Sequence, residues 1–171
     1  MLINSGMKQI NKKTLNLSKS TNYKLNIQSL PNTTFWAKTV SIPSISANAA
    51  EIPNPMYGST YIPSNTINWE PLNIEFMVDE DFSNYFELLD LIYKAANPDV
   101  TGRESDINQL ITTGSLHVLS NNKNSTQTVF TFHNMFPTSL GEISFNNDSA
   151  EGIVCSATLQ FDNMTYENKS N

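Results

Sequence analysis

The spacing of apolar residues changes once in the middle of the chain, and this change most constrains the fold. Residues Trp69 to Asp79 alternate between apolar and polar side chains, which is the pattern of a half-buried strand. Directly afterwards the spacing becomes 3.6 residues, as on one face of an amphipathic helix. We therefore expect a strand followed at once by the only long helix, whose apolar stripe comprises Phe82, Tyr85, Phe86, Leu89, Ile92, Tyr93 and Ala96.

Three consecutive carboxylates, Asp79, Glu80 and Asp81, stand where this helix should begin. Carboxylates at a helix N-terminus accept hydrogen bonds from free backbone N–H groups and oppose the helix dipole. The three residues are therefore predicted to cap the helix. Together with Glu87 they could instead supply oxygen ligands to Mg²⁺ or Ca²⁺. The spacing lacks the loop of an EF-hand, and capping already explains the leading carboxylates, so neither a metal site nor a cofactor is predicted.

Alternating patterns on both sides of this junction predict more strands. Before the junction, Asn22 to Gln28 and Thr33 to Val40 are expected to form a hairpin through a turn at Pro31-Asn32. After it, a second hairpin and two further strands are expected, at Ser115 to Ser120, Thr126 to His133, Glu142 to Phe145 and Ile153 to Phe161. The predicted fold class is α+β and mostly β: an antiparallel barrel or sandwich with one flanking helix.

The domain organisation follows from length and composition. A chain of 171 residues suffices for one domain with a real core. Residues 1–21 show weak apolar periodicity and carry several lysines, so they are predicted to be a mobile N-terminal arm, with partner docking as the alternative. Residues 22–171 are predicted to be a single domain with an extended arm at 44–68. Thr101 to Thr113 reads as a linker with a possible short helix at Asp106 to Ile111.

The segment from Ser44 to Asn68 combines prolines with large apolar residues. Proline cannot donate to a strand ladder, so Pro53, Pro55 and Pro63 exclude a central strand. We expect an extended arm or a long hairpin with Gly58-Ser59 near its tip. Its apolar side chains need burial, either against the chain's own core or against a neighbouring chain. The candidate subunit-interface residues are Ile45, Ile52, Met56, Tyr57, Tyr61 and Ile62.

The residues capable of nucleophilic or acid–base chemistry are few. His117, His133 and Cys155 could form a Cys-His pair, but the expected hairpin sets His117 opposite Val129 and leaves His133 beyond the paired strand. Cys155 falls on an apolar strand face, where a thiol behaves as a small hydrophobe. No phosphate-binding glycine loop or hydrolase motif occurs. A net charge of −6 argues against tight binding of nucleic acid. The sequence predicts that the protein is not an enzyme.

The stretch from Trp69 to Tyr85, WEPLNIEFMVDEDFSNY, resembles the tail-tube family of contractile-tailed bacteriophages. The similar pattern is a strand, then Val-Asp-Glu, then a helix with an Asn-aromatic pair near its start. Shorter similar pieces follow the same order between Asn22 and Glu167: Leu30-Pro31-Asn32, Ser41-Ile42-Pro43-Ser44-Ile45, the turn Phe136 to Gly141, and Ala157 to Phe161.

This resemblance implies a structural virion protein that assembles as a homo-hexameric ring. In the family, six subunits join their sheets into one inner barrel, and rings stack into a tube through which DNA passes as cargo. Related members end the tube at the neck or start it at the baseplate. The implied partners are stacked rings and other tail proteins such as sheath, tape measure, neck or baseplate.

The resemblance also implies localisation in the virion tail. No apolar run approaches a membrane span and no signal peptide is evident, so synthesis in the host cytoplasm without membrane association is expected. A monomeric protein-binding module, with residues 44–68 as its recognition loop, is the alternative from a different functional class.

Overall fold

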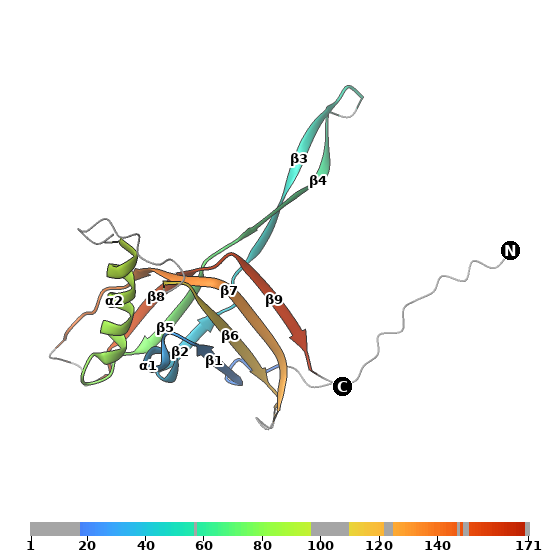
Figure 1. The fold of residues 1–171 in the computed structure, drawn as a ribbon. Helices are drawn as coiled ribbons and strands as arrows, with labels where there is room; N and C mark the ends of the chain where they lie inside the picture. Colours follow the sequence, from blue (N-terminus) through green and yellow to red (C-terminus); the bar gives the residue numbers. More distant parts are fainter. Residues whose placement is uncertain are drawn as a thin grey trace.

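A computed structural model describes residues 18–56, 58–96, 110–121, 125–146, 148 and 151–169. Its fold is mostly β, antiparallel, with a helix on one side, which confirms the predicted fold class (Figure 1). The elements in chain order are β1 (Tyr23–Ile27), α1 (Pro31–Phe35), β2 (Ala37–Ser41), β3 (Ile45–Asn54), β4 (Gly58–Trp69), β5 (Leu72–Met77), α2 (Ser83–Ala96), β6 (Thr112–Leu119), β7 (Thr126–Leu140), β8 (Val154–Gln160) and β9 (Asn163–Asn168).

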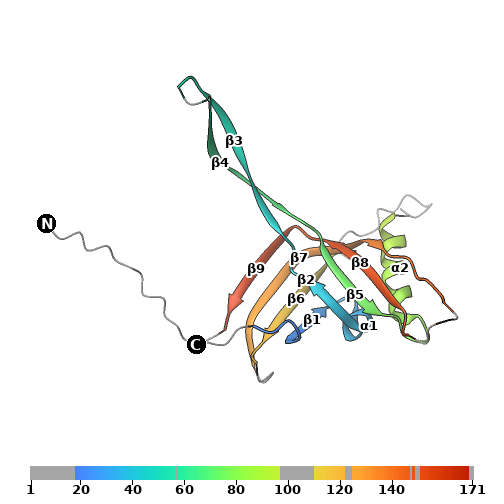
Figure 2. The same ribbon diagram turned by 180° about the vertical axis from the view of Figure 1, so that it is seen from behind.

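Strand β7 connects two groups of strands in the body. The strand order is β1-β6-β7-β8-β5-β2, and β9 also pairs with β7. The first half of β7 pairs with β6 and β9, and its second half pairs with β8, for example Phe136 with Gln160. The strands thus form the groups β1-β6-β7-β9 and β7-β8-β5-β2, which curve around a shared interior (Figure 2).

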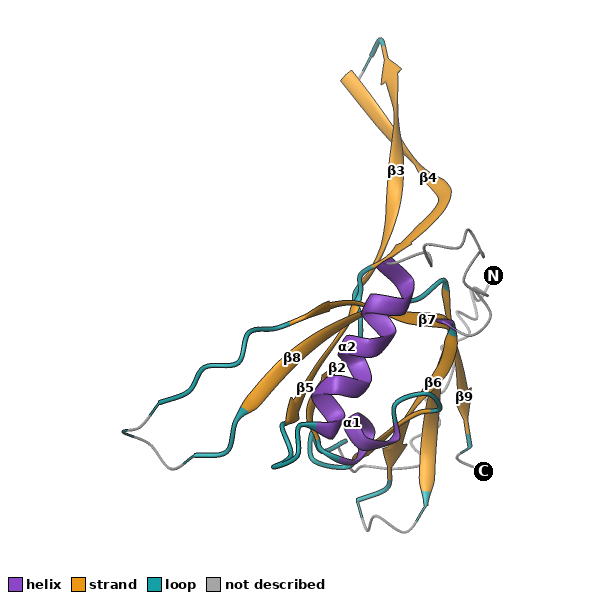
Figure 3. Cartoon of the chain, turned by 60° about the vertical axis from the view of Figure 1, so that its left-hand side comes forward, coloured by secondary structure: helices purple, strands orange, loops and turns teal. Residues whose placement is uncertain are grey.

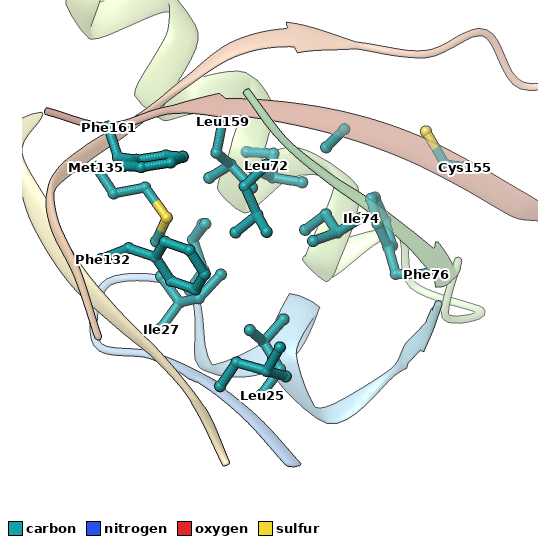
Figure 4. Close-up of a cluster of buried hydrophobic side chains, with 14 residues drawn as sticks. Leu25, Ile27, Leu72, Ile74, Phe76, Phe132, Met135, Cys155, Leu159 and Phe161 are labelled. Atoms are coloured by element: carbon teal, nitrogen blue, oxygen red, sulfur yellow. The ribbon is translucent and has the colours of Figure 1, made fainter. Parts of the chain in front are cut away.

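Alternation along the strands builds the core between these groups. In β5 every second residue is buried, and the same holds in β8 for Cys155, Ala157 and Leu159. Side chains from both groups meet in the interior, where the rings of Phe132 and Phe161 lie 5.2 Å apart (Figure 4). Burial of this apolar surface is the main favourable term in folding. The fully or almost fully buried residues include Leu25, Ile27, Leu72, Ile74, Phe76, Phe132, Met135 and Leu159.

The junction between β5 and α2 is held by the side chain of Asn84, which is fully buried. Its Nδ2 donates to the Met77 carbonyl at 2.7 Å, and its Oδ1 accepts from the Asp79 N–H at 3.4 Å. Met77 is the last residue of β5, and Asp79 lies in the turn that follows the strand. Phe82, at the turn into the helix, has a left-handed φ of 57°. The abrupt change from strand to helix therefore depends on one amide.

Helix α1 is fastened to α2 by Thr33, which is also buried. The Thr33 hydroxyl lies 3.1 Å from the Asn84 carbonyl and donates to the Glu87 carboxylate at the same distance, while the Thr33 N–H donates to Glu87 at 3.2 Å. The fully buried side chain of Leu88 lies on the same side of α2 as Asn84. Figure 3 shows the two helices in contact beside the sheet.

The predicted apolar stripe of the long helix is only partly correct: Tyr85 packs against the core as expected, but the buried side of the helix is rotated toward Asn84 and Leu88. The structure buries Asn84 and Leu88 and packs Leu91 against the core, whereas Phe86 and Tyr93 are 52% and 57% exposed. The reason is the Asn84 amide, which must face the end of β5 to reach Met77. Helix α2 therefore presents its second apolar side to solvent.

Two predictions before the junction are also wrong. Thr33 to Phe35 belong to α1, because Pro31 favours the first turn of a helix and the Thr34 hydroxyl bonds to the Leu30 carbonyl. Strand β2 begins only at Ala37. The expected hairpin between the first two strands does not form, since β1 pairs with β6 and β2 pairs with β5.

Three predictions after the junction are wrong in whole or in part. The turn expected from Phe136 to Gly141 is strand up to Leu140, and the strand expected at Glu142 to Phe145 is irregular. Val154–Gln160 is confirmed as a strand but is not the last one, because β9 follows it. The hairpin of β6 and β7 is confirmed, with His117 opposite Val129.

Two further predictions fall largely outside the described residues. The proposed N-terminal arm, 1–21, has only residues 18–21 within them. Of the linker with a possible short helix at Asp106 to Ile111, only the end from Leu110 onward is described.

Replacing the junction amide tests its role in the fold. Asn84→Ala removes a buried amide together with its hydrogen bonds to the Met77 carbonyl and the Asp79 N–H, so we expect the free energy of unfolding to fall by about 2 kcal/mol. The matched control is Asp90→Ala, an exposed change on the same helix, which should stay within about 0.5 kcal/mol of the unchanged protein. Urea unfolding measures both. Equal stability of the two variants would contradict the assignment.

Candidate assembly surface

Strands β3 and β4 form a separate two-stranded sheet that stands away from the body in every view (Figures 1 to 3). Pairing runs from Ile45 opposite Trp69 to Asn54 opposite Gly58, with an irregularity between Ala47 and Ala49. Twelve residues of β4 at about 3.3 Å each give an arm of up to about 40 Å. This is the long hairpin that the proline pattern predicts, with Gly58 at its tip in a left-handed conformation, φ 84°.

The base of the hairpin is joined to the core. Trp69 packs against the core cluster and its ring lies 6.0 Å from that of Phe161, while the Glu70 N–H donates to the Ser44 carbonyl at 3.1 Å. Pro53 and Pro63 are tolerated because each strand has only one partner. The hairpin is thus a defined extension of the body.

The apolar side chains of the hairpin are exposed along its length. Among the predicted interface residues, exposure ranges from 44% for Ile62 to 82% for Met56. The side chain of Tyr57 lies outside the described residues. Burial against the chain's own core, one of the two alternatives from the sequence, does not occur. The exposed apolar residues of the hairpin are Ile45, Ile52, Met56, Tyr61, Ile62 and Ile67.

Ile67, which is 56% exposed, also belongs to this surface, although it is not among the predicted interface residues. Its neighbours Thr66 and Asn68 are polar, so strand alternation was a signal that could have found it. An isolated two-stranded hairpin is at best marginally stable in water. An arm of this length that exposes six large apolar side chains fits a surface that another chain covers.

A second exposed apolar surface lies over the start of α2. The ring of Phe82 is 6.3 Å from that of Phe86 and 6.4 Å from that of Phe145, which is 75% exposed. Sequence periodicity had assigned Phe82 and Phe86 to the core. Phe145 comes from the segment after β7, so only the tertiary structure brings the three rings together.

The three acidic residues of the junction lie in the turn before α2, since the helix begins at Ser83 and its first turn contains no acidic residue. Asp79 accepts a short hydrogen bond from the Ser83 hydroxyl through Oδ2, and its Oδ1 is buried without a hydrogen-bond partner. Glu80 and Asp81 are exposed. Their proximity to the positive end of the helix dipole keeps capping as a prediction, and Asn84 is the side chain that bonds to the backbone there.

The two histidines and the cysteine do not meet. His117 on β6 lies 3.1 Å from the Ser115 hydroxyl, and His133 pairs opposite Asn163 of β9, 3.0 Å from the Thr165 hydroxyl. Cys155 is buried in β8, where its Sγ donates to the Gly141 carbonyl at 3.4 Å. The geometry supplies no Cys-His pair.

Within the part of the chain that the structure describes, no three His, Cys, Asp or Glu side chains are grouped so that they could hold a metal ion. In the same residues, no helix has the length and apolar character needed to cross a membrane.

Known proteins similar to this chain were found in sequence and in structure. No protein-family model matches the chain. In sequence it is 26% identical over 166 residues to the tail tube terminator protein of Enterobacteria phage T4, which covers 91% of this chain and 92% of that protein. In structure it matches the tube-terminating cap of the anti-feeding prophage with a TM-score of 0.65 at 16% identity, covering 94% of this chain and 99% of the other.

A chain of the sheath–tube complex of PVC, an extracellular contractile injection system, matches with a TM-score of 0.64 at 15% identity over 91% and 94% of the two chains. The fold is that of the tube components of contractile systems. The resemblance to the contractile-tail tube family is thereby confirmed, and the similar protein in sequence is a tail tube terminator protein.

Two ionisable groups, the buried Cys155 thiol and the half-buried Tyr23 phenol, predict the response of the fold to high pH. Burial raises the pKa of the Cys155 thiol and of the Tyr23 phenol. A raised pKa means that the folded state keeps a proton which the unfolded state loses, so stability is present at neutral pH and decreases as pH rises beyond about 8.5 for the thiol and about 10 for the phenol. We expect the free energy of unfolding to fall above these values.

In the double variant Cys155→Ala/Tyr23→Phe the fall should be shallower, because neither group can ionise in the unfolded state. Urea unfolding at intervals between pH 7 and pH 11 measures the two slopes. Identical slopes would contradict the assignment.

Proposed function

We propose that this chain is a structural protein of a phage tail that forms a homo-hexameric ring at the end of the tail tube, as a tube terminator. The observation that carries the proposal is the β3–β4 hairpin, which exposes six large apolar side chains along an arm with no core of its own. Packing against a neighbouring subunit would bury this surface. Closed rings are a common way for identical subunits to cover such surfaces.

The position in the tail rests on the comparison in sequence. The main tube and the terminator share one fold, and the TM-scores of 0.64 and 0.65 do not separate the matched structures. The sequence relative of nearly equal length is a terminator. This favours the terminator over a main-tube ring and over a ring that initiates the tube at the baseplate.

In this role the ring would contact the last tube ring on one axial side and tail proteins such as sheath, tape measure or neck components elsewhere. DNA would pass through it as cargo. The net charge of −6 supports passage without tight binding, because a protein that holds DNA neutralises phosphates with lysine and arginine.

Electron microscopy of the purified full-length protein tests assembly and position together. We expect six-fold rings that stop at one or two layers even at high concentration. Unlimited stacking into tubes would support the main-tube role instead. A protein that sediments as a monomer at high concentration would overturn the ring and favour the alternative, a monomeric binding module that uses the hairpin as its recognition loop.

Polar substitution of the hairpin tests the surface that carries the proposal. The variant Ile52→Ser/Tyr61→Ser/Ile62→Ser should fold as before, because all three side chains are exposed, but its ring population should fall by at least about tenfold through lost apolar burial. The matched control Ser46→Ala changes an exposed polar position on the same arm and should assemble normally. Sedimentation velocity and circular dichroism report assembly and folding separately. Undiminished ring formation by the triple variant would exclude the hairpin from the interface.

A further inference from the structure

An open groove separates β1 and β2, the two end strands of the sheet path. Its volume is about 900 Å³, and its lining comes from β1, β2 and α1, including Tyr23, Leu25, Phe35 and Val40. The two strands do not pair with each other. The Tyr23 hydroxyl instead spans the opening and donates to the Lys38 carbonyl at 2.6 Å. Because a whole tyrosine side chain fits between them, the strands stand farther apart than the 4.7–4.9 Å of a paired ladder.

Backbone groups of β1 face this groove. The Asn22 carbonyl and the Gln28 N–H bond to the β6 side, so alternation along the strand turns the backbone groups of Tyr23, Leu25 and Ile27 to the opposite side. The Ile27 N–H donates a hydrogen bond to the Thr34 hydroxyl oxygen at 3.3 Å. Tyr23 and Leu25 therefore offer an edge to which one more extended strand can be added.

The groove has a positive rim. Lys24 of β1 and Lys38 of β2 both line it, both are exposed, and its lining contains no acidic residue. An extended segment with negative charge and at least one large apolar side chain would complement the groove in charge, backbone and hydrophobicity.

One described segment of this chain has these properties. After Gly141, whose N–H donates to the Ser156 carbonyl at 2.7 Å, residues 142–146 have no regular structure. Glu142 and Phe145 are exposed there, and exposed Asp148 follows. Among the described residues, Glu142, Ser144 and Phe145 take part in no backbone hydrogen bond and no strand pairing. This stretch contains no basic residue.

We infer that the segment after β7, residues 142–146 with Asp148, docks in the β1–β2 groove of a second copy of this chain. It adds a strand at the edge of β1, and Glu142 and Asp148 lie near Lys24 and Lys38. The basic N-terminal residues 1–17 are disfavoured as the occupant, because their lysines would meet the lysines of the rim. The β3–β4 hairpin carries only one acidic residue, Glu51, and is two strands wide.

The two surfaces lie on different sides of the body. Figures 1 and 2 both show the segment after β7 beyond α2, on the side of that helix away from β1. A contact between unlike surfaces of identical chains is head-to-tail, and it closes into a ring when the rotation between subunits permits. The inference thus rests on the proposed ring and names the surfaces that join adjacent subunits, a contact separate from the hairpin.

Charge reversal in the full-length protein tests this contact. Lys24→Glu/Lys38→Glu and, separately, Glu142→Lys/Asp148→Lys should each weaken ring formation by about tenfold at low salt, as expected for the loss and repulsion of two exposed charge pairs. The chain with all four changes should regain the assembly of the unchanged protein. Lys94→Glu/Lys169→Glu, which alters net charge equally at exposed sites away from the groove, is the control and should have no comparable effect. Mass photometry measures the ring fraction, and circular dichroism checks folding.

The outcomes separate this contact from the ring itself. If the unchanged protein forms rings but the four-fold variant does not recover, the contact is refuted and the ring stands. If the unchanged protein is a monomer, the synthetic peptide Leu140 to Ser149 is titrated into isotope-labelled full-length protein. Amide shifts at Tyr23 and Leu25 that disappear in Lys24→Glu/Lys38→Glu would uphold the contact without the ring, and their absence would refute both.

Discussion

The buried amide of Asn84 is the interaction on which the orientation of the outer surface depends. The chain passes from β5 to α2 through a short turn, between the Met77 carbonyl at the end of β5 and the Asp79 N–H after it. Backbone polar groups that lack a partner cost free energy, and here a side chain supplies the partner. Asn84 does so from the first turn of α2 and thereby sets the rotation of the helix. Leu88 then faces the core, and Phe86 and Tyr93 face solvent.

The body and the hairpin differ in how far their strand edges and faces are covered. In the body, β7 shares its length between β6, β9 and β8, so that most strands have neighbours on both sides and a common core. In the hairpin, the two strands pair only with each other, so their outer edges stay open and neither face has a second layer. Its apolar side chains gain burial only from another molecule. A subunit built this way is incomplete in its packing.

The two proposed contacts would contribute differently to assembly. Apolar burial along the hairpin is non-directional and supplies most of the affinity, whereas an added strand with matched charges fixes register and orientation. A ring that ends a tube differs from a ring that continues it in the properties of one axial face. Since both kinds share one fold, this difference resides in side chains on that face and leaves the backbone comparison unchanged.

The sequence by itself determined the local elements: β1, β5, the β6–β7 hairpin with His117 opposite Val129, the body of β8, and the proline-containing hairpin with Gly58 at its tip. These follow from alternation and turn chemistry, which act between near neighbours. Only the tertiary structure decided which strands pair across the chain, as β1 with β6 and β2 with β5, and which side of α2 is buried. Pairing between distant strands depends on the shared core, and the rotation of α2 depends on an amide reaching another element. The same distinction between local and distant interactions applies to the candidate surfaces. Most exposed apolar residues of the hairpin could be predicted from the sequence of that segment alone. The groove between β1 and β2 exists only because the pairings of β1 with β6 and of β2 with β5 leave the other edges of β1 and β2 open.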